Sequence, residues 1–306
     1  MSGDTPDVTV IIATRDRPEL LRRALDGIIA SEYEGAVECL VVFDQSTPDT
    51  AIEMAAPGRR VSTTRNSRSQ GLAGARNTGI LQAETKLIAF CDDDDEWLPG
   101  KLSKQVAALN AHPEAHFAAT GIAIRYKDQD TERLPVPERL THEGFLADRM
   151  TEVHPSSFLA EREWLIGHVG LVDENLPGSY AEDYDLLLRV AKAGPIAVAP
   201  EPLVRIWWHG ASFFFERWKM IDDALTYLLD KHPEFERSRA GKARILGQQA
   251  FAQAAMKQRG RAARTALATL RLSPLEKRAF LAMIVATGAI SAERALAFAH
   301  RFGKGI

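Results

Sequence analysis

Four consecutive aspartates, Asp92 to Asp95, are the residues of this sequence best suited to chemistry. Carboxylates about 4 Å apart repel by ~4 kcal/mol at the effective dielectric of a protein surface, so such a run needs solvent, basic partners or a cation. Hard carboxylate oxygens favour Mg²⁺ or Mn²⁺. A solvated acidic loop is the alternative, but the run directly follows an apolar segment, Leu87 to Cys91, with no flexible spacer. The pattern therefore predicts a divalent-metal site.

Two later stretches carry polar residues that could serve the same site. Glu182 and Asp183 begin a segment of helical spacing, where an acidic first turn is favoured by the helix dipole, so simple capping is the alternative to chemistry. His209 lies in the aromatic-rich stretch RIWWHG. A single histidine is more often a packed or surface residue, and it is a metal-ligand candidate only if it faces the acidic run.

The surrounding segments predict the elements that position these residues. Short apolar runs of buried-strand length alternate with stretches of helical spacing in the order β-α-β-β-α-β. This order predicts an α/β fold with a mostly parallel central sheet and helices on both faces. The four runs are Val8 to Ala13, Val37 to Phe43, Val61 to Thr64 and Leu87 to Cys91.

Polar residues follow several of these predicted strands. Thr14 and Arg15 follow the first strand, Asp44 follows the second, and Arg76 and Asn77 lie in a glycine-bearing helix entry, GLAGARNTG. Ligands of open α/β sheets bind outside the carboxyl ends of the strands, so we expect these residues to converge on one crevice. Singly each signal is weak, because Asp44 could cap a turn and Arg76-Asn77 could be helix surface. The glycines form neither a Walker loop nor GxGxxG.

The later chain predicts more strands and then only helices. From Ser212 onward, helical segments are separated by prolines and glycines, which predicts a catalytic-type domain over residues 1–214 and a helical extension over 215–306. The earlier segments are strands at His116 to Tyr126, Val153 to Leu159 and Ile196 to Val204, a polar loop at Lys127 to Thr141, and a helix at Glu161 to His168.

Composition narrows the class of protein. The 306 residues are 45% hydrophobic, enough for a substantial core. Both cysteines, Cys39 and Cys91, lie in apolar runs, which predicts buried reduced thiols. The amino terminus lacks a signal pattern, and no run approaches the ~20 apolar residues of a spanning helix, so we expect a cytoplasmic protein.

The charge of the chain is strongly asymmetric. Residues 231–306 hold 15 basic and 4 acidic residues, a net charge of +11, whereas the rest of the chain has −14. Basic helices with apolar residues such as Leu281, Met283, Ile284 and Val285 suit contact with the inner face of an anionic membrane. The alternative is that these helices pack on the acidic domain. No nucleic-acid partner is expected.

The ordered motifs VTVIIATRDRPELL, ARNTGI, FCDDDDEWLPGKL, VGLVDE and AEDYDLLLR resemble those of family-2 glycosyltransferases with the GT-A fold. The resemblance covers Val8 to Ser212. It implies that Thr14, Arg15 and Asp44 hold a nucleotide, with Arg76 and Asn77 nearby. It also implies Asp92 or Asp93 near the ribose, Asp94 as direct metal ligand, Asp183 as general base and His209 as a late-loop partner of the metal.

The resemblance further implies a metal-dependent, inverting enzyme of the hexosyltransferase type. Its donor would be a nucleotide-diphosphate sugar, UDP-linked, and its acceptor a hydroxyl of a glycan or lipid-linked acceptor in polysaccharide or cell-envelope synthesis. Two departures matter: Phe43 stands where members often have an aspartate, which leaves base recognition to Asp44, and Val172 replaces a usual Phe. The rival classes are a noncatalytic nucleotide-sugar-binding protein and a two-carboxylate glycosidase.

Overall fold

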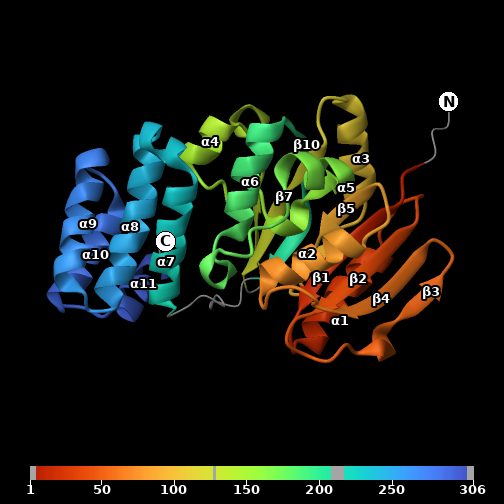
Figure 1. Ribbon diagram of the computed structural model, residues 1–306, viewed down its shortest axis with the longest axis horizontal. Coiled ribbons are helices and arrows are strands. Elements are labelled where there is room, and N and C mark those ends of the chain that lie inside the picture. The colour runs from red at the N-terminus through yellow and green to blue at the C-terminus, as the bar shows by residue number, and fades with distance from the viewer. Residues whose placement is uncertain (1–4, 127–128, 208–216, 302–306) are drawn as a thin grey trace. The chain divides into compact units, whose positions relative to one another are not determined.

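A computed structural model describes residues 5–126, 129–207 and 217–301, with side chains up to residue 296 (Figure 1). The chain divides into two compact units. The sheet unit is drawn from residues 1–142, 150–174 and 182–210, and the helical unit from residues 143–149, 175–181 and 211–306.

The sheet has a parallel half built from the apolar runs of the sequence. The strand order of the whole sheet is β3-β4-β2-β1-β5-β9-β7-β10-β6. In the parallel half, β1 pairs with both β2 and β5. The prediction of an α/β fold with a mostly parallel central sheet flanked by helices is confirmed. The parallel strands of this half are β1 (Val8–Thr14), β2 (Val37–Phe43), β4 (Arg59–Arg65) and β5 (Leu87–Phe90), and β3 (Met54–Ala56) pairs antiparallel with β4 at the edge.

Helices cover both faces of this sheet because apolar residues point from both sides of each strand. On one face Val8, Val10 and Ile12 join a core cluster with the apolar stripe of α1 (Pro18–Ile29). On the other face α2 (Leu72–Gln82) packs so closely that a Cβ added at Gly79 would lie 2.4 Å from Ile11 Cγ2. The glycines of this helix entry therefore serve close packing.

The other half of the sheet is mixed in direction. It contains β6 (Asp95–Trp97), β7 (Phe117–Tyr126), β8 (Gln129–Arg133), β9 (Leu159–Glu161) and β10 (Ile196–Trp207). Here β10 pairs in parallel with β7, whereas β9 runs antiparallel to both β5 and β7. The helices of this half are α3 (Lys101–Ala111), α5 (Arg162–Trp164) and α6 (Glu182–Ala193).

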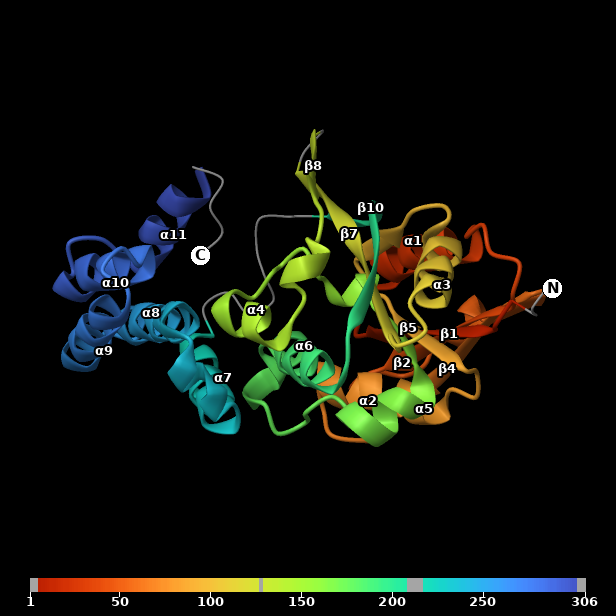
Figure 2. The same ribbon diagram turned by 90° about the horizontal axis from the view of Figure 1, so that it is seen from above.

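Two local predictions are wrong in this half, and a third is confirmed with a change of helix type. The segment predicted as a strand over Val153 to Leu159 instead forms a 3₁₀ turn, η3 (Pro155–Ser157), before the short β9, because proline has no N–H to give to a ladder. The predicted loop at Lys127 to Thr141 contains β8, which forms a hairpin with β7 (Figure 2). The predicted helix at Glu161 to His168 is present, as α5 continued without a break by a π-helical turn at Leu165–Val169.

The helical unit packs through small residues. A core of alanines, including Ala250, Ala254 and Ala266, lets the helices approach closely around Phe251, so the predicted C-terminal helices are present. None of the helices in the described part of the chain is long and apolar enough to cross a membrane. The helices are α4 (His142–Ala147), α7 (Trp218–Lys231), α8 (Arg239–Ala255), α9 (Arg259–Leu272), α10 (Lys277–Thr287) and α11 (Ala292–Arg301).

Both cysteines are free and buried, as predicted. Burial raises the pKa of the Cys39 thiol to about 12 and that of Cys91 well above its usual range, so neither is a reactive thiolate. The domain boundary at 214/215 stays a prediction, because residues 208–216 lie outside the described residues.

Candidate active site

The parallel register brings the ends of β1, β2 and β5 to one edge of the sheet. Thr14, the last residue of β1, pairs with Phe43 of β2, and Ile11 pairs with Phe90 of β5. The Thr14 hydroxyl donates a hydrogen bond of 2.6 Å to Asp93, and both side chains are buried. The predicted convergence of strand ends therefore links the first loop directly to the acidic run.

The acidic run is not a solvated loop, because Asp93 and Asp95 are only 1% and 2% exposed, whereas Asp92 and Asp94 are partly exposed. Burial raises the pKa of Asp93 to about 6, although Thr14 and Arg17 act in the opposite direction. Burial, followed by the charges of Asp92 and Asp94, raises the pKa of Asp95 well above its usual range. The alternating burial therefore creates an electrostatically strained cluster that a cation would relieve.

Asp94, the residue expected to ligate the metal, lies against an arginine. Arg17, from the loop after β1, forms ion pairs of 3.0 Å with Asp94 and 3.1 Å with Asp93. Arg23 donates to the backbone carbonyl of Asp94 at 3.0 Å. Basic side chains thus supply part of the charge compensation at this end of the run.

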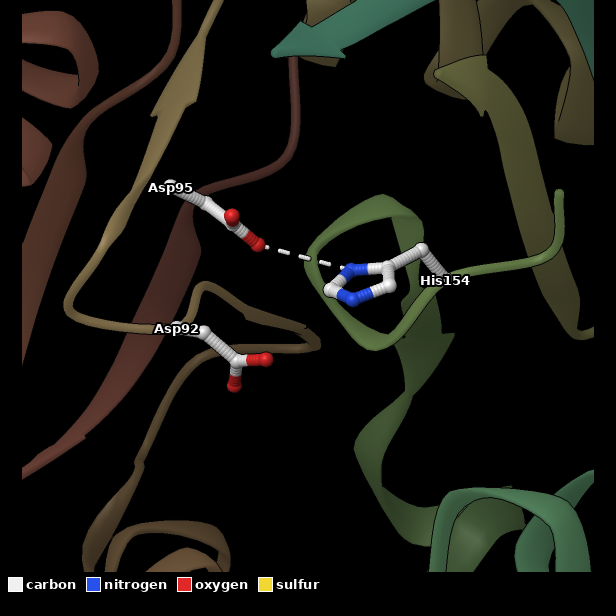
Figure 3. Close-up of side chains that lie close together, drawn as sticks. All are labelled: Asp92, Asp95 and His154. Atoms are coloured by element: carbon white, nitrogen blue, oxygen red, sulfur yellow. Dashed lines mark ion pairs between the residues drawn. The ribbon is translucent and has the colours of Figure 1, made fainter. Parts of the chain in front are cut away.

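A group of potential metal ligands lies at the other end of the run (Figure 3). Asp92, Asp95 and His154 each offer one ligand atom, and these atoms all lie within 4.8 Å of one another. The His154 Nδ1 lies 3.4 Å from an Asp95 carboxylate oxygen. Burial lowers the pKa of His154, which keeps the imidazole neutral and able to ligate. Two carboxylates and an imidazole fit a divalent cation such as Mn²⁺.

Ser156 connects the members of this group. Its buried hydroxyl accepts a hydrogen bond from the Asp92 N–H at 2.9 Å and donates to the Asp95 carboxylate. Its own N–H donates to His154 Nδ1 at 3.3 Å, and its carbonyl accepts from the Trp97 indole at 3.0 Å. The turn η3 is therefore fastened to the acidic run through one serine.

The acidic first turn of α6 faces the same cluster. Arg76 is buried and forms ion pairs with Asp92 (2.6 Å) and with Glu182. Although burial acts to lower it, the pKa of Arg76 is raised by Asp92, Glu182 and Asp183. Asp183 is partly exposed and also raises the pKa of His154 against the effect of burial. The structure thus brings the predicted base within electrostatic range of the acidic run.

Asn77 and Arg76, both expected near the nucleotide, are engaged with protein groups. The Asn77 side chain exchanges hydrogen bonds of 2.8 and 2.9 Å with the backbone of Val172 and donates to Glu174 at 2.7 Å. Glu174 also accepts from Arg68, and these donors outweigh burial and lower its pKa to about 2. Contacts of Asn77 and Arg76 with a nucleotide stay predictions.

The remaining predicted nucleotide contacts are at the ends of β1 and β2. Asp44 is buried and accepts hydrogen bonds from Asn66 (2.8 Å), Gln45 (2.8 Å) and the Gly71 N–H (3.1 Å). These contacts fix the Asp44 carboxylate at the end of β2, and its contact with a nucleotide stays a prediction. Arg15 is about half exposed and 3.8 Å from Asp16.

Reasoning from the sequence placed Asp95 in the acidic run without giving it a role of its own, and it missed His154, Ser156 and Arg17. The signal that could have revealed two of them is the polar sequence His154-Pro155-Ser156-Ser157 before an apolar run. His209, the predicted histidine ligand, lies outside the described residues.

The family model described as Glycosyl transferase family 2 matches residues 9–167, just over half of the chain. The chain belongs to that family. The matched region contains β1, the acidic run and His154. Membership in glycosyl transferase family 2 is what the sequence motifs implied, and that prediction is confirmed.

Curated relatives and solved structures agree with this family. Over 211 residues the chain is 30% identical to the succinoglycan biosynthesis protein ExoO of Rhizobium meliloti (strain 1021), a match covering 64% of this chain and 59% of ExoO. It is 29% identical to the Escherichia coli UDP-Glc:alpha-D-GlcNAc-diphosphoundecaprenol beta-1,3-glucosyltransferase WfaP, covering 61% of this chain and 71% of WfaP.

Two solved structures share the fold at low identity. The S. aureus TarS 1–349 structure has a TM-score of 0.59 at 15% identity and covers 97% of this chain and 92% of that one. The Pyrobaculum calidifontis mannosyltransferase PcManGT, solved with GDP-Man and Mn²⁺, has a TM-score of 0.57 at 17% identity and covers 98% and 88% of the two chains. These likenesses support the GT-A fold predicted from the motifs.

Proposed function

We propose that this chain is an inverting, metal-dependent glycosyltransferase of the hexosyltransferase type. It transfers a sugar from a nucleotide-diphosphate sugar, UDP-linked, to an acceptor hydroxyl in polysaccharide or cell-envelope glycan synthesis. The observation that carries the proposal is the buried Arg76, which pairs Asp92 of the acidic run with Glu182, the residue before Asp183. The names of ExoO and WfaP support the substrate class, and TarS has been solved with UDP-GlcNAc.

In this reaction each residue has a separate task. Asp183 removes the acceptor hydroxyl proton while that oxygen bonds to the anomeric carbon and the bond to the diphosphate breaks. One displacement inverts the configuration, so no covalent sugar intermediate forms. A divalent cation, when bound, would neutralise the charge that develops on the leaving diphosphate. Thr14, Asp44 and the partly exposed Arg15 hold the nucleotide.

We propose Mn²⁺ or Mg²⁺ as the cation, with two candidate ligand sets. The geometry favours Asp92, Asp95 and His154, and the family resemblance favours Asp94 with His209. Asp92 and Asp93 would also lie near the ribose. His154→Ala and Asp94→Ala therefore separate the two sets, because the variant that lacks a true ligand should lose Mn²⁺ affinity.

Calorimetric titration tests the donor and metal together. UDP and GDP are titrated into the full chain with Mn²⁺ and with EDTA, followed by a panel of sugar nucleotides. We expect binding of a nucleoside diphosphate that tightens at least about tenfold in Mn²⁺. Equal UDP affinity in EDTA and Mn²⁺ contradicts the metal role, and binding of a sugar nucleotide without any transfer or hydrolysis favours a noncatalytic binding protein.

The acceptor is proposed to be a glycan or lipid-linked acceptor met at the inner face of the cell membrane, by a cytoplasmic enzyme. Support comes from α10, where Phe280, Met283 and Ile284 are exposed on one face. On α9 the exposed Leu267 lies between Arg264 and Arg271 at helical spacing. Basic residues near anionic lipid contribute about 1 kcal/mol each.

Of the apolar residues first assigned to this membrane face, two are placed differently. Val285 is buried in the alanine-rich core, and Leu281 packs partly against the same core. Val285 lies one helical turn after the buried Ala282, and Leu281 is next to Ala282. Both therefore lie on the side of α10 that faces the core. Phe280 takes the place of these residues in the proposed contact.

Sedimentation with anionic liposomes tests this contact in the full chain. We expect the wild type to sediment at low salt and less at high salt, and the double variant Phe280→Ser, Ile284→Ser to stay in the supernatant. Leu81→Ser, an exposed apolar residue of the sheet unit, is the matched control. A wild-type chain that stays in the supernatant at low salt contradicts membrane contact without affecting the transferase proposal.

A further inference from the structure

Arg17 occupies a position that a metal-dependent transferase should leave to its cation. Its guanidinium contacts Asp93 at 3.1 Å and Asp94 at 3.0 Å, bridging a buried and a partly exposed carboxylate. The Asp93 carboxylate is also fixed by Thr14 at 2.6 Å. Arg17 therefore contacts two different carboxylates. Asp93 is buried and held by Thr14, whereas the side chain of Asp94 is partly exposed.

The backbone sets the position of Arg17, while its side chain is partly exposed to solvent. Arg17 precedes Pro18, the first residue of α1, and its carbonyl accepts from the Leu21 N–H at 3.0 Å. Its side chain is 44% exposed, whereas Asp93 is 2% exposed. An anchored backbone with a half-exposed guanidinium suits a group that exchanges one anionic partner for another.

A divalent cation on Asp94 would stand beside the guanidinium of Arg17. Two like charges about 4 Å apart repel, by ~4 kcal/mol for unit charges at a protein-surface dielectric and by more when one is divalent. The donor also brings a diphosphate to the same strand ends. A guanidinium binds phosphate oxygens in a bidentate way and is more weakly hydrated than an ammonium group.

We infer that Arg17 is a resident counter-ion of the acidic run, which the divalent cation displaces from Asp94 and which then binds the diphosphate of the donor. This rests on the proposed function and on the ligand set that contains Asp94. In the ligand-free chain Arg17 competes with the cation, and in the donor complex it holds the leaving group.

The two roles have opposite signs, which makes the inference testable. Arg17→Gln removes the charge and leaves a shorter, neutral polar side chain. Without nucleotide it should bind Mn²⁺ about 3- to 10-fold more tightly, because the competitor is gone. With saturating Mn²⁺ it should bind UDP about 10-fold more weakly, because a charge-assisted phosphate contact is lost.

The experiment measures Mn²⁺ affinity by electron paramagnetic resonance and UDP affinity by calorimetry in the full chain. Arg22→Gln is the matched control, since Arg22 is an exposed arginine of α1, the helix that follows Arg17, with no ion pair in the described part of the chain. Arg17→Lys adds a second test: the charge remains, so Mn²⁺ affinity should stay near that of wild type, while UDP affinity falls with loss of the guanidinium fork. Thermal melts establish that each variant is folded.

Each outcome decides between the inference and the function beneath it. If UDP binding by the wild type does not depend on Mn²⁺, the proposed metal-dependent function is wrong, and this inference is wrong with it. If wild type binds normally but Arg17→Gln weakens Mn²⁺ and UDP alike, Arg17 only shapes the loop, and the inference is overturned. If Arg17→Gln matches Arg22→Gln in both titrations, the contact is only a surface ion pair, which overturns it as well.

Discussion

The two units bury acidic residues in opposite ways. In the sheet unit, Asp93 and Asp95 are buried beside other carboxylates, and their pKa values are raised by burial. In the helical unit, Asp222 is equally buried, yet it accepts 2.8 Å contacts from both Gln253 and Arg261. In the first set, repulsion between carboxylates persists beside contacts with Thr14, Arg17 and Ser156. The second carboxylate has an amide and a guanidinium as partners and no acidic neighbour among these contacts.

This difference indicates what each set is for. A buried carboxylate with repulsive neighbours destabilises the fold unless a ligand compensates it, whereas a paired one holds its helices together. Gln253 extends the second network by accepting from Thr265 at 2.8 Å, which joins α7, α8 and α9. Substitutions should therefore affect function in the sheet unit and stability in the helical unit.

The largest effect is expected for Asp183→Asn. The carboxamide keeps the shape of the side chain but cannot accept the acceptor proton, so transfer should fall by ~10² to 10⁴. Folding and UDP binding should be unchanged in thermal melts and calorimetry. Asp26→Asn, an exposed acid of α1, is the control. Near-normal turnover in Asp183→Asn would leave Asp183 as a helix cap.

Asp222→Ala should show the reverse pattern. Removing this carboxylate leaves the Gln253 amide and Arg261 without their partner. We therefore expect the free energy of unfolding, measured by urea denaturation, to fall by about 2–4 kcal/mol. Mn²⁺-dependent UDP binding should not change. The neighbouring Asp223, 45% exposed and paired with Lys219 at 2.5 Å, is the control and should cost under about 1 kcal/mol. Equal losses in the two variants would end the distinction between the units.

Ser156→Ala tests whether metal binding depends on the orientation that Ser156 gives to Asp92 and Asp95. Loss of the hydroxyl leaves the Asp92 N–H and the Asp95 carboxylate without their shared partner, and we expect Mn²⁺ affinity to fall about 10- to 100-fold. Ser157→Ala is a close control, because the buried Ser157 hydroxyl has no hydrogen-bond partner among the described residues. Unchanged Mn²⁺ binding in Ser156→Ala would move the ion away from Asp92, Asp95 and His154.

Lys101→Met sharpens the comparison through pH. Burial lowers the pKa of Lys101 to about 7, although its ammonium donates to Gln105 at 2.7 Å and lies 3.7 Å from the Trp97 ring centroid. An unfolded lysine titrates near 10.4, so between these values the unfolded wild type binds more protons and wild-type stability rises with pH. Below pH 7 lysine is charged in both states, and its burial penalty is fully present.

The stability gained by Lys101→Met should therefore be largest below pH 7. It should shrink by about 1 kcal/mol per pH unit between pH 7 and 10. Urea denaturation of wild type and variant at pH 6, 8 and 9.5 measures this. A stability difference that is constant over this range would show that Lys101 is charged throughout.

The residues at the edge of the sheet that carries the acidic run could largely be predicted, because the carboxyl ends of parallel strands lie together. Apolar runs such as Val8 to Ala13 are buried on both faces, and parallel pairing places their carboxyl ends together, so Thr14, Asp44 and the acidic run had to share one edge. The contact between Thr14 and Asp93 follows from that register.

The segment around His154 could not be predicted in the same way. Its neighbour β9 runs antiparallel between β5 and β7, and this insertion carries His154 and Ser156 to the acidic run across some sixty residues of sequence. Antiparallel insertion leaves no periodic signal in a strand of three residues. The segment Val153 to Leu159, with polar residues before Phe158 and Leu159, was therefore predicted as one longer strand.

By itself the sequence determined the parallel sheet, the acidic run at a strand end and the family, since local apolar patterning and motif order are properties of the chain alone. Only the tertiary structure decided which aspartates are buried, that Ser156 joins Asp92 to Asp95, and that Arg17 lies on Asp93 and Asp94. The physical reason is that burial and charge compensation depend on which distant segments pack together, and four adjacent aspartates look alike until their neighbours are in place.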